Sequence, residues 1–364
     1  MKRILLIWLV IYPTLFAYDR ALPGFDYEFP RDHFEHPSFQ TEWWYYTGNL
    51  ETTEGRRFGF ELTFFRHALR EESERGTVWG VRDVYLAHLA LTDLRGRRFF
   101  KEQRRNRGGP GLAGSSLEGS RLWNGNWEVR WLDLQDPLGA QRLSGVGQDF
   151  ALDLTLTPRK PPVVHGLNGV SQKAEAAGRA SHYVSFTRLE VQGRVALHGT
   201  THEVKGSAWM DHEFFTESMA ADQIGWDWAS VQLDNNTELM IYRLRRAGAT
   251  VDVHSSGTFI DAQGGLTHLN WDDLMMEPEG DVWTSPATAA RYPLRWKIGV
   301  PSLGLELVCS TPFREQEVVS EGSLTPNYWE GAVDYEGSVG GAPVTGKGYL
   351  ELTGYDKPVS LGGP

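Results

Sequence analysis

The sequence predicts an all-β protein made of two tandem antiparallel β-barrel domains. Three observations support this prediction: the chain has 364 residues, apolar and polar residues alternate in many short segments, and one half of the chain resembles the other. Such a length favours two domains, and evenly spaced strands joined by hairpin turns are typical of barrels and sandwiches. A barrel of about eight strands also has room for one apolar ligand in its interior or mouth.

The internal duplication can be followed from landmarks that keep the same order in both halves. An aromatic start, an apolar strand, a polar turn, a second apolar strand and an aromatic–Arg ending occupy Trp44–Arg66, and again Trp226–Arg243. Further along, Gly206–Trp209 matches Gly346–Tyr349. The offset between matching landmarks shrinks along the chain, which indicates longer loops in the first half. We therefore expect an N-terminal domain at residues 25–215 and a C-terminal domain at 216–364.

Alternation with a period of two marks strands in both proposed domains. In chain order the clearest segments are Phe58–Phe64, Phe150–Leu156, Tyr183–Val191, Glu238–Leu244 and Leu350–Thr353. Turn residues separate these segments. The pair Asn235-Asn236 suits a two-residue type I′ hairpin turn, because Asn tolerates a positive φ. Two short helical segments are expected, at residues 172–177 and 218–222.

The first 17 residues have the pattern of a signal peptide. Lys2 and Arg3 give a charged start, an apolar run extends from Ile4 to Phe16, and Ala17 supplies a small residue for cleavage. The run is short for a transmembrane helix. We expect a secreted or periplasmic protein after cleavage of residues 1–17, with no stable membrane insertion. An uncleaved membrane anchor is the alternative.

Composition and motifs argue against several classes of function. The formal net charge of −11 disfavours a nucleic-acid partner, which needs a basic surface. Cys309 is the single cysteine and lies in an apolar segment, where a buried hydrophobic role is expected rather than a nucleophilic one. His212-Glu213 begins a zinc-protease motif that Thr216 leaves incomplete. The sequence has no Rossmann, P-loop or Gly-x-Ser-x-Gly motif. We therefore expect no cofactor and no catalytic metal.

The strongest candidate for chemistry is Trp209-Met210-Asp211-His212-Glu213, in which three ionisable residues are adjacent. The matching segment of the second half, Gly346–Glu351, carries no such triplet. On a strand, Asp211 and Glu213 face one side and His212 the other. Aromatic surroundings raise the pKa of a carboxyl group and make it a usable general acid near neutral pH. We expect this cluster to line a cleft between the domains.

Two further groups set carboxylates or imidazoles among large aromatic residues. The first is Asp32, His33 and His36 followed by Glu42-Trp43-Trp44-Tyr45, and the second is Gly225-Trp226-Asp227-Trp228. Aromatic faces stabilise a carbocation by cation–π attraction, which suits protonation of an alkene. The alternative is structural, with the tryptophans in the barrel cores and with Glu42 and Asp227 paired to Arg66 and Arg243. Asp32, His33 and His36 could also bind a metal, but nothing fixes a further ligand.

Four stretches of the sequence resemble a known protein family. The stretches Asp32–Leu50, Gly206–Phe214, Gly225–Arg245 and Gly346–Tyr355 resemble the AttH-like proteins, also called predicted secreted hydrolases, which are similar to carotenoid 1,2-hydratase. The resemblance covers nearly the whole mature chain. It implies two tandem lipocalin-like antiparallel β-barrel domains, a site in the cleft between them and no cofactor. It also implies that an acid and an upstream histidine are catalytic.

Carried over residue by residue, the catalytic set of the hydratases corresponds to His182, Trp209 and Asp211. The hydratases have an aromatic residue two positions after that histidine, where this sequence has Val184. This departure argues against carotene hydration itself. The plain export signal also implies a different pool of substrates.

Two hypotheses follow. The first is an exported, cofactor-independent hydratase or isomerase, or else a hydrolase, acting on a lipophilic small molecule. Asp211 would be the general acid and His182 would orient it or position water. Further candidates complete this site: Glu213, His212, Glu42 and Asp227 as acid–base groups, and Trp209, Trp44, Tyr45, Trp226 and Trp228 as the substrate wall.

The second hypothesis is a non-enzymatic carrier of lipids or other hydrophobic ligands in the cell envelope. The AttH-like proteins that the sequence resembles often occur beside transporter permeases, so an envelope transporter permease is the partner expected for such a carrier. The fold alone does not decide between the hypotheses, because one barrel type serves both roles. A carrier tolerates Asp211→Asn, whereas an acid catalyst loses on the order of a hundredfold or more in rate.

Overall fold

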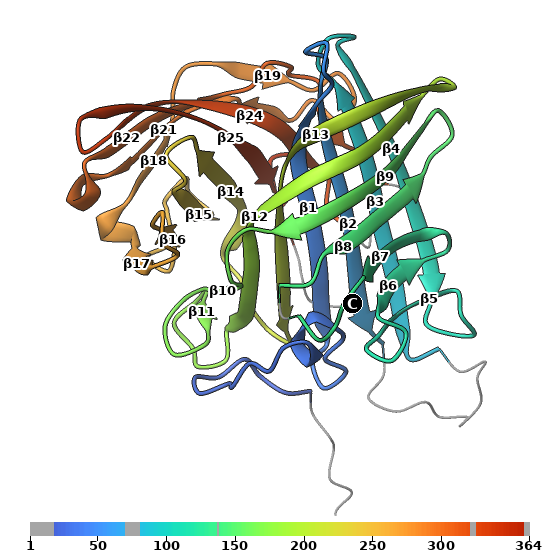
Figure 1. Ribbon diagram of the computed structural model, residues 1–364. Helices are drawn as coiled ribbons and strands as arrows, with labels where there is room; N and C mark the ends of the chain where they lie inside the picture. The colour runs from blue at the N-terminus through green and yellow to red at the C-terminus, as the bar shows by residue number, and fades with distance from the viewer. Residues whose placement is uncertain (1–17, 70–80, 137, 321–324, 360–364) are drawn as a thin grey trace, which may run out of the picture.

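The computed structural model describes residues 18–69, 81–136, 138–320 and 325–359, so the predicted signal peptide at 1–17 lies outside the described residues. Within these ranges the chain forms two large curled antiparallel sheets and a small separate hairpin (Figure 1). This confirms the predicted all-β fold with two lipocalin-like units. No helix in the described ranges is long and apolar enough to span a membrane.

The first sheet has the strand order β4-β3-β2-β1-β13-β12-β9-β8-β7-β6-β5, and β10 and β11 also pair with β12. The sheet curls until the side chains of its two ends meet: Asn106 Nδ2 donates to Asn124 Oδ1 at 2.7 Å, and the Arg104 guanidinium lies 4.1 Å from the ring centre of Trp127. The strands are β1 (Thr41–Glu51), β2 (Arg57–Ala68), β3 (Asp83–Asp93), β4 (Arg98–Arg107), β5 (Ala113–Ser116), β6 (Arg121–Asn124), β7 (Trp127–Trp131), β8 (Gln141–Val146), β9 (Phe150–Pro158), β10 (Val163–Val164), β11 (Ser171–Gln172), β12 (Ala180–Leu197) and β13 (Thr200–Phe215).

The second sheet has the order β17-β16-β15-β14-β25-β24-β22-β21-β18, with β23 paired to β24, and β19 pairs with β20 as a separate hairpin. Short 3₁₀ turns occur at Arg31–His33, Trp271–Asp273 and Pro301–Leu303. The strands are β14 (Gln223–Leu233), β15 (Glu238–Arg246), β16 (Ser256–Ile260), β17 (Leu266–Asn270), β18 (Met275–Pro278), β19 (Val282–Thr284), β20 (Arg291–Pro293), β21 (Arg295–Val300), β22 (Leu305–Ser310), β23 (Glu317–Val318), β24 (Tyr328–Val339) and β25 (Ala342–Thr353).

The duplication read from the sequence is visible in the strand pairing. In the first half β13 lies between β1 and β12, and in the second half β25 lies between β14 and β24. The residue pairing of β13 with its neighbours also corresponds to that of β25. Asp211 stands between Tyr45 on β1 and Ser185 on β12, and Glu351 stands between Trp228 on β14 and Glu330 on β24.

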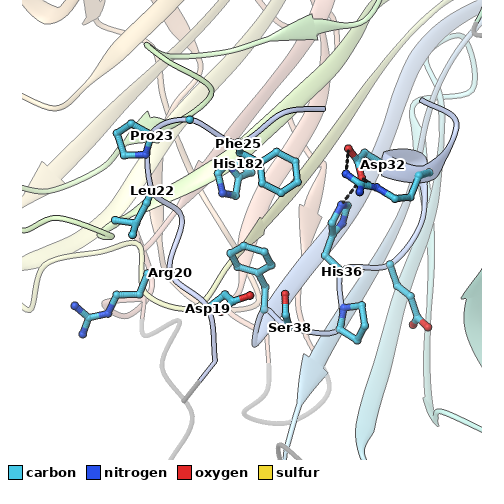
Figure 2. Close-up of a pocket in the computed structure, with 14 residues that line it drawn as sticks. Asp19, Arg20, Leu22, Pro23, Phe25, Asp32, His36, Ser38 and His182 are labelled. Atoms are coloured by element: carbon cyan, nitrogen blue, oxygen red, sulfur yellow. Dashed lines mark hydrogen bonds and ion pairs between the residues drawn. The ribbon is translucent and has the colours of Figure 1, made fainter. Parts of the chain in front are cut away.

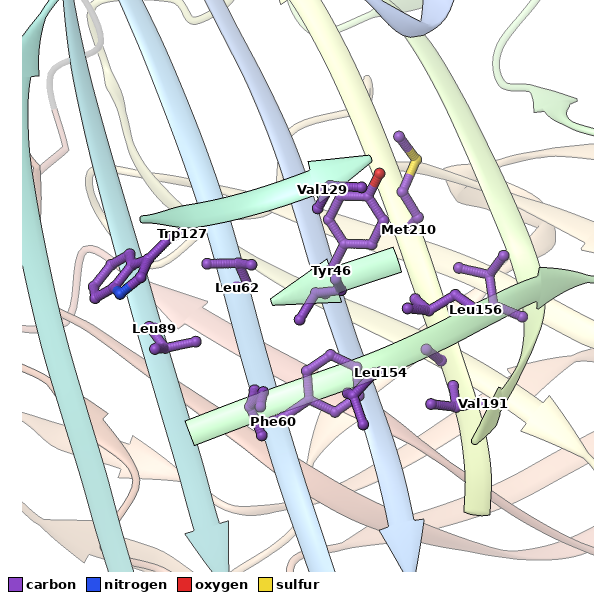
Figure 3. Packing of buried hydrophobic residues seen from close by; sticks show 14 of the residues in the cluster. Tyr46, Phe60, Leu62, Leu89, Trp127, Val129, Leu154, Leu156, Val191 and Met210 are labelled. Carbon is purple, nitrogen blue, oxygen red and sulfur yellow. The ribbon is translucent and has the colours of Figure 1, made fainter. Parts of the chain in front are cut away.

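Each sheet encloses its own apolar core, because alternate residues of every strand point inward. The core of the first barrel includes Tyr46, Phe60, Leu89 and Met210 (Figure 3). The second core includes Trp296, Trp329 and Cys309, and burial of Cys309 agrees with its predicted hydrophobic role. A third buried cluster lies where the outer faces of the two sheets meet.

Three local predictions were wrong. Residues 172–177 and 218–222 form no helix and are strand ends, bends and turns. The β14–β15 turn is not type I′, because only Asn236 has a positive φ, of 63°. Three residues separate Leu233 from Thr237, whose carbonyl accepts from Leu233 N at 2.9 Å. Asn at the last turn position satisfies the single left-handed residue that such a loop needs.

Candidate functional site

The candidate site lies between the two sheets, on the faces that point away from the barrel cores. Strands β1, β2, β12 and β13 of the first sheet pack against β14, β15, β24 and β25 of the second. The contact is close: a Cβ added at Gly59 of β2 would lie 2.6 Å from the Tyr349 hydroxyl. The buried apolar residues of this interface are Tyr45, Tyr183, Trp209, Trp228, Met240, Tyr242, Leu244, Ala332 and Tyr349, with Trp43 and Trp226 partly buried at its edge.

Asp211 sits at the centre of a hydrogen-bond network in this interface and is only 4% exposed. Its Oδ2 accepts from the Tyr183 hydroxyl at 2.6 Å, and its Oδ1 accepts from the Trp209 indole at 2.6 Å and from the Ser185 hydroxyl. The second domain reaches the network through the Trp228 indole, which donates to the Tyr183 hydroxyl at 3.0 Å. Asp211 and its partners therefore join both domains.

The network continues away from Asp211 through a histidine. Ser185 Oγ lies 2.7 Å from His165 Nε2, and His165 Nδ1 lies 2.9 Å from Thr258 Oγ1 of the second domain. Burial lowers the pKa of His165 to about 3, so the imidazole is neutral and has one N–H. Because hydroxyls and a neutral imidazole both donate and accept, this chain can reverse its direction. It can satisfy Asp211 either as a carboxylate or as a protonated acid.

The electrostatics of Asp211 are those of an acid that titrates near neutrality. Burial raises the pKa of Asp211 to about 7, and the hydrogen bonds from Ser185, Tyr183 and Trp209 keep it from rising further. Burial disfavours the charged carboxylate, whereas donors directed at it favour that form. Both protonation states are therefore populated around pH 7, as acid–base catalysis requires.

Glu213 lies on the same face as Asp211, as strand alternation predicts. Its Oε2 accepts from the Ser181 hydroxyl and lies 3.6 Å from Lys173 Nζ. The same ammonium lies 3.8 Å from the ring centre of Tyr242. Glu213 thus has a cationic partner, and Asp211 is the member of the pair without one.

Three carboxyl groups of the interface were missed in the sequence. Glu61 of β2 and Glu330 of β24 are each 1% exposed, and Glu351 of β25 is partly buried. Burial raises the pKa of Glu61 to about 7 and that of Glu351 to about 8. Burial and then the negative charge of Glu61 raise the pKa of Glu330 well above its usual range. The interface is therefore an array of protonatable carboxyls from both domains.

Specific donors hold this second set of carboxyls. Glu61 Oε1 accepts from the Tyr328 hydroxyl at 2.9 Å, and that hydroxyl also lies 2.5 Å from His88 Nδ1. Glu330 Oε1 accepts from the Tyr45 hydroxyl at 2.5 Å. Among the described residues, the other oxygens, Glu61 Oε2 and Glu330 Oε2, are buried without a hydrogen-bond partner. A buried oxygen without a donor disfavours the carboxylate form.

Glu351 is the equivalent of Asp211 in the second half. The matching segment of the second half carries no triplet of ionisable residues, but the strand registers place its single carboxyl, Glu351, at the position equivalent to Asp211. The offset between Trp209 and Tyr349 already aligns these two carboxyls, and that offset could have identified Glu351. Glu61 and Glu330 have a weaker signal. Glu61 is the single acidic residue of β2, but Glu330 shares β24 with Asp334 and Glu336.

Glu42, His212 and Trp44 lie elsewhere, inside the end of the first barrel. Glu42 Oε1 is 2.8 Å from His212 Nε2, and the His212 ring stacks on Trp44 with 4.7 Å between ring centres. Glu42 also pairs with Arg66 at 3.5 Å, which was the structural alternative for this residue. Trp44 and Glu42 therefore do not line the interface with Tyr45, because neighbours on a strand point to opposite faces.

His182 lines a different cavity, of about 570 Å³, beneath the N-terminal segment (Figure 2). Its Nδ1 lies 2.9 Å from the Gly169 carbonyl oxygen, and its ring lies 4.4 Å from that of Phe25. Tyr183, the next residue on β12, is the one that reaches Asp211. The expectation that His182 orients Asp211 was therefore wrong. Tyr183 and Ser185 hydrogen-bond to Asp211 instead.

Asp227 lies inside the second barrel and is fully buried. Its carboxylate pairs with Arg243 at 3.3 Å and with Arg245 at 3.1 Å, and Tyr355 donates to it at 2.8 Å. This is the ion pair that the structural alternative proposed. Trp226 and Trp228, on either side of Asp227, point to the interface instead.

The predicted residues thus separate into an interface set and a set inside the barrels. Asp211, Glu213, Tyr45, Trp209, Trp226 and Trp228 meet at the interface. The interface set can donate and accept protons next to aromatic faces in a site largely closed to water. In the other set, His36, Glu42 and His212 bring three metal-ligand atoms within 4.8 Å of one another.

The fold and this interface define a class: two lipocalin-like barrels that pack through their outer faces and enclose carboxyl and aromatic side chains. The chain belongs to the AttH-like family, whose model matches residues 20–355. Among curated proteins, no sequence matches this one.

Solved structures agree with this assignment. An AttH protein from Nitrosomonas europaea is 32% identical, with a TM-score of 0.82 over 93% of this chain and 99% of that one. Kievitone hydratase from Nectria haematococca has a TM-score of 0.69 at 17% identity, over 88% of this chain and 90% of that one. CghA has a TM-score of 0.52 at 10% identity, over the same shares of the two chains. The last two similarities establish the shared fold only.

Proposed function

We propose that the protein is an enzyme that protonates an unsaturated lipophilic small molecule at the interface between its domains, in the class of hydratases and isomerases. The single observation that supports this most is Asp211, a buried carboxyl with a pKa of about 7 among the aromatic rings of Tyr183, Trp209 and Trp228. The fold shared with kievitone hydratase is consistent with it.

The proposed reaction balances without a further reagent. The Asp211 carboxyl transfers its proton to one alkene carbon, the π electrons form the new C–H bond, and the other carbon becomes cationic. The faces of Trp209, Trp228 and Tyr45 stabilise that cation. Water then adds its oxygen and returns a proton to the Asp211 carboxylate, which gives hydration. Loss of a neighbouring C–H proton to the same carboxylate gives isomerisation instead.

Ser185 and His165 support this cycle because their hydrogen bonds can reverse. When Asp211 is ionised, the Ser185 hydroxyl donates to it. When Asp211 is protonated, Ser185 can accept from it and donate to His165 Nε2, with His165 Nδ1–H directed at Thr258. The carboxyl therefore keeps satisfied partners in both states. Preorganised groups of this kind lower the reorganisation that proton transfer costs.

Substrate access requires the interface to open. Asp211 and Glu213 are 4% and 8% exposed, and the partly buried Trp43 and Trp226 stand where the interface meets solvent. We propose that a ligand enters between these two tryptophans as the domains part. Closure around the ligand would then exclude water from the cation.

We also propose that the protein acts outside the cytoplasm, as a secreted or periplasmic protein. The signal-peptide pattern of residues 1–17 supports this proposal. Fractionation of cells that express the full chain, with mass spectrometry of its N-terminus, tests it. A mature N-terminus at Tyr18 in the exported fraction is expected, and an intact Met1 in the cytoplasm contradicts it.

Native mass spectrometry of wild-type and Asp211→Asn protein incubated with an envelope extract tests the catalytic proposal. The mutant is expected to retain a ligand that the wild type converts. A gain of the mass of water indicates hydration, a fragment indicates hydrolysis, and conversion without a change of mass indicates isomerisation. Asp153→Asn, an exposed carboxylate paired with Arg142, is the matched control and should behave as the wild type. If all three proteins carry one unchanged ligand, the protein is a carrier and the catalytic proposal is wrong.

A further inference from the structure

We propose that His36, Glu42 and His212 bind a divalent transition-metal ion that fastens the N-terminal segment to the end of the first barrel. His36 belongs to the segment before β1, Glu42 to the start of β1, and His212 to β13. The three donors are His36 Nδ1, Glu42 Oε1 and His212 Nε2, and they lie within 4.8 Å of one another. Two imidazoles with one carboxylate form a common ligand set for zinc and iron.

Two of the three distances between the donor atoms are short. Glu42 Oε1 is 2.8 Å from His36 Nδ1 and 2.8 Å from His212 Nε2. A tetrahedral ion with bonds of about 2.0–2.2 Å separates its ligand atoms by roughly 3.3 Å. Each of these two distances would have to lengthen by about half an ångström to admit such an ion. The third distance, between His36 Nδ1 and His212 Nε2, is at most 4.8 Å and would have to match the same separation.

The hydrogen-bonding partners favour a cation at this point. His36 Nε2 lies 3.1 Å from Asp32 Oδ1, so each of its ring nitrogens faces a carboxylate oxygen. A carboxylate accepts and cannot donate, which means that a neutral His36 would present one lone pair to an anion. A second ring proton, which makes His36 an imidazolium, satisfies both carboxylates. A metal ion at Nδ1 supplies the same positive charge, and Nε2–H then donates to Asp32.

His212 presents the same conflict at a more buried place. His212 is only 1% exposed. His212 also hydrogen-bonds to the backbone of Asp32. Its Nε2 then faces Glu42 Oε1, which can only accept. A cation shared between Nε2 and Oε1 satisfies both atoms while the imidazole stays neutral.

Asp32 lies where a metal-bound histidine usually has a hydrogen-bonding partner for its second ring nitrogen. Such histidines donate their second N–H to a carboxylate or a backbone carbonyl, which fixes the ring and its tautomer. Figure 2 shows Asp32 directed at His36. The other oxygen of Glu42, Oε2, accepts from the His36 backbone N–H at 2.9 Å and lies 3.5 Å from Arg66. The same N–H lies 3.2 Å from Oε1, and Oε1 is the oxygen that faces both imidazoles.

A fourth ligand can come from solvent. The His36 side chain is 11% exposed and lines the cavity of about 570 Å³ with Asp32 and His182. Water from this cavity can complete the coordination. The proposal differs from the expectation of no metal drawn from the sequence, and it explains why His212 stands between Asp211 and Glu213: alternation directs the carboxyls to the interface and the imidazole to the metal.

Titration of the tag-free protein with Zn²⁺ by isothermal calorimetry and by thermal melting tests the proposal. One Zn²⁺ per chain is expected, with a rise in Tm of about 5 °C at saturating metal. Binding should weaken as the pH falls, because the metal displaces protons from imidazole. His36→Gln and His212→Gln should each weaken Zn²⁺ binding at least tenfold.

His254→Gln is the matched control, because His254 Nδ1 lies 2.8 Å from Asp252 in a histidine–carboxylate pair outside this group. It should bind Zn²⁺ as the wild type does. Absence of stoichiometric binding by the wild type overturns the proposal, and so does undiminished binding by His36→Gln. If His212→Gln does not fold, Co²⁺ added to the wild type still decides. A visible absorption band of nitrogen-bound Co²⁺ that His36→Gln lacks supports the site, and identical spectra overturn it.

Discussion

Asp211 and Glu351 occupy equivalent positions in the two halves of the interface, but their surroundings differ. Asp211 has three side-chain donors and stands opposite Ser185. Glu351 stands opposite another carboxyl, Glu330, where Ser185 would be. The first position can hold a carboxylate or an acid, whereas the second concentrates carboxyls that repel one another when ionised.

The difference indicates how a duplicated fold acquires a site. Both halves bury acidic residues against the partner domain. Among the described interface carboxyls, Asp211 is the one that combines three side-chain donors with a reversible path through His165. The second half instead keeps its carboxyls protonated through burial and mutual repulsion. Glu330 accepts a hydrogen bond between the domains from the Tyr45 hydroxyl, and its protonated form can donate a further one.

Replacing the two equivalent carboxyls separates catalysis from packing and has the largest expected effect. Asp211→Asn should reduce turnover on the order of a hundredfold or more, since general acid catalysis typically contributes that much. Glu351→Gln should reduce it less than tenfold, because Gln keeps the size and the hydrogen bonds of a protonated Glu. Conversion of the ligand identified by mass spectrometry measures both. Equal losses would mean that the two halves are functionally alike.

The pH dependence of the free energy of unfolding tests whether the second set of carboxyls is protonated in the folded protein. Glu61 has a folded pKa of about 7 and an unfolded pKa of about 4.3, so the folded state binds the proton more tightly. Its contribution to stability is therefore complete below about pH 4 and is lost as the pH rises towards 7 to 8. Raising the pH from 5 to 8 should therefore lower the free energy of unfolding by about 2 kcal/mol through this group. Urea unfolding at several pH values measures the change.

Glu61→Gln should reduce that pH dependence by the share of Glu61, because Gln does not titrate whereas Asp211 and Glu351 still do. Glu190→Gln should not, since Glu190 is exposed and pairs with Arg159 at the surface. An unchanged slope in Glu61→Gln would mean that Glu61 is ionised in the folded protein and that the interface contains a cation or water that stabilises it.

Tyr183→Phe should have a smaller effect, which is a change in the pKa of Asp211. Removing the hydroxyl that donates to Asp211 Oδ2 at 2.6 Å withdraws a donor from the carboxylate, so the pKa of Asp211 should rise. The expected rise is about one unit, equivalent to roughly 1.4 kcal/mol. Infrared absorption of protonated carboxyls, followed against pH, measures it. Tyr242→Phe, which removes another buried hydroxyl of the interface, serves as the comparison and should leave this titration in place.

The sequence could predict which faces of β13 carry its residues, but not what covers those faces. Alternation placed Asp211 and Glu213 together and His212 opposite, because the period of a strand is fixed. The same alternation made Glu61 and Glu330 resemble ordinary solvent-facing residues of a barrel. Only the packing of one sheet on the other turns these outward positions into buried ones. That packing is a long-range property, which local patterns do not carry.

Nearness along the chain also misled the grouping of candidates. Glu42, Trp44 and Tyr45 are close in sequence, yet Glu42 and Trp44 point into the first barrel and Tyr45 points to the second domain. Asp227 separates in the same way from Trp226 and Trp228. The duplication was the better guide, since it aligned Trp209 with Tyr349 and hence Asp211 with Glu351.

His182→Gln should have the smallest effect and distinguishes the two sides of β12 most sharply. The imidazole binds the Gly169 carbonyl and packs on Phe25 and Phe214, with the β12 backbone between it and Asp211. The titration of Asp211 should therefore move by less than about 0.3 units. The loss of packing should still lower stability by about 1 kcal/mol, the typical cost of a point substitution. If His182→Gln shifted the carboxyl titration as far as Tyr183→Phe, the two faces of this strand would be coupled. His182, the histidine that the resemblance to the hydratases implied, would then act on Asp211 through the strand rather than by contact.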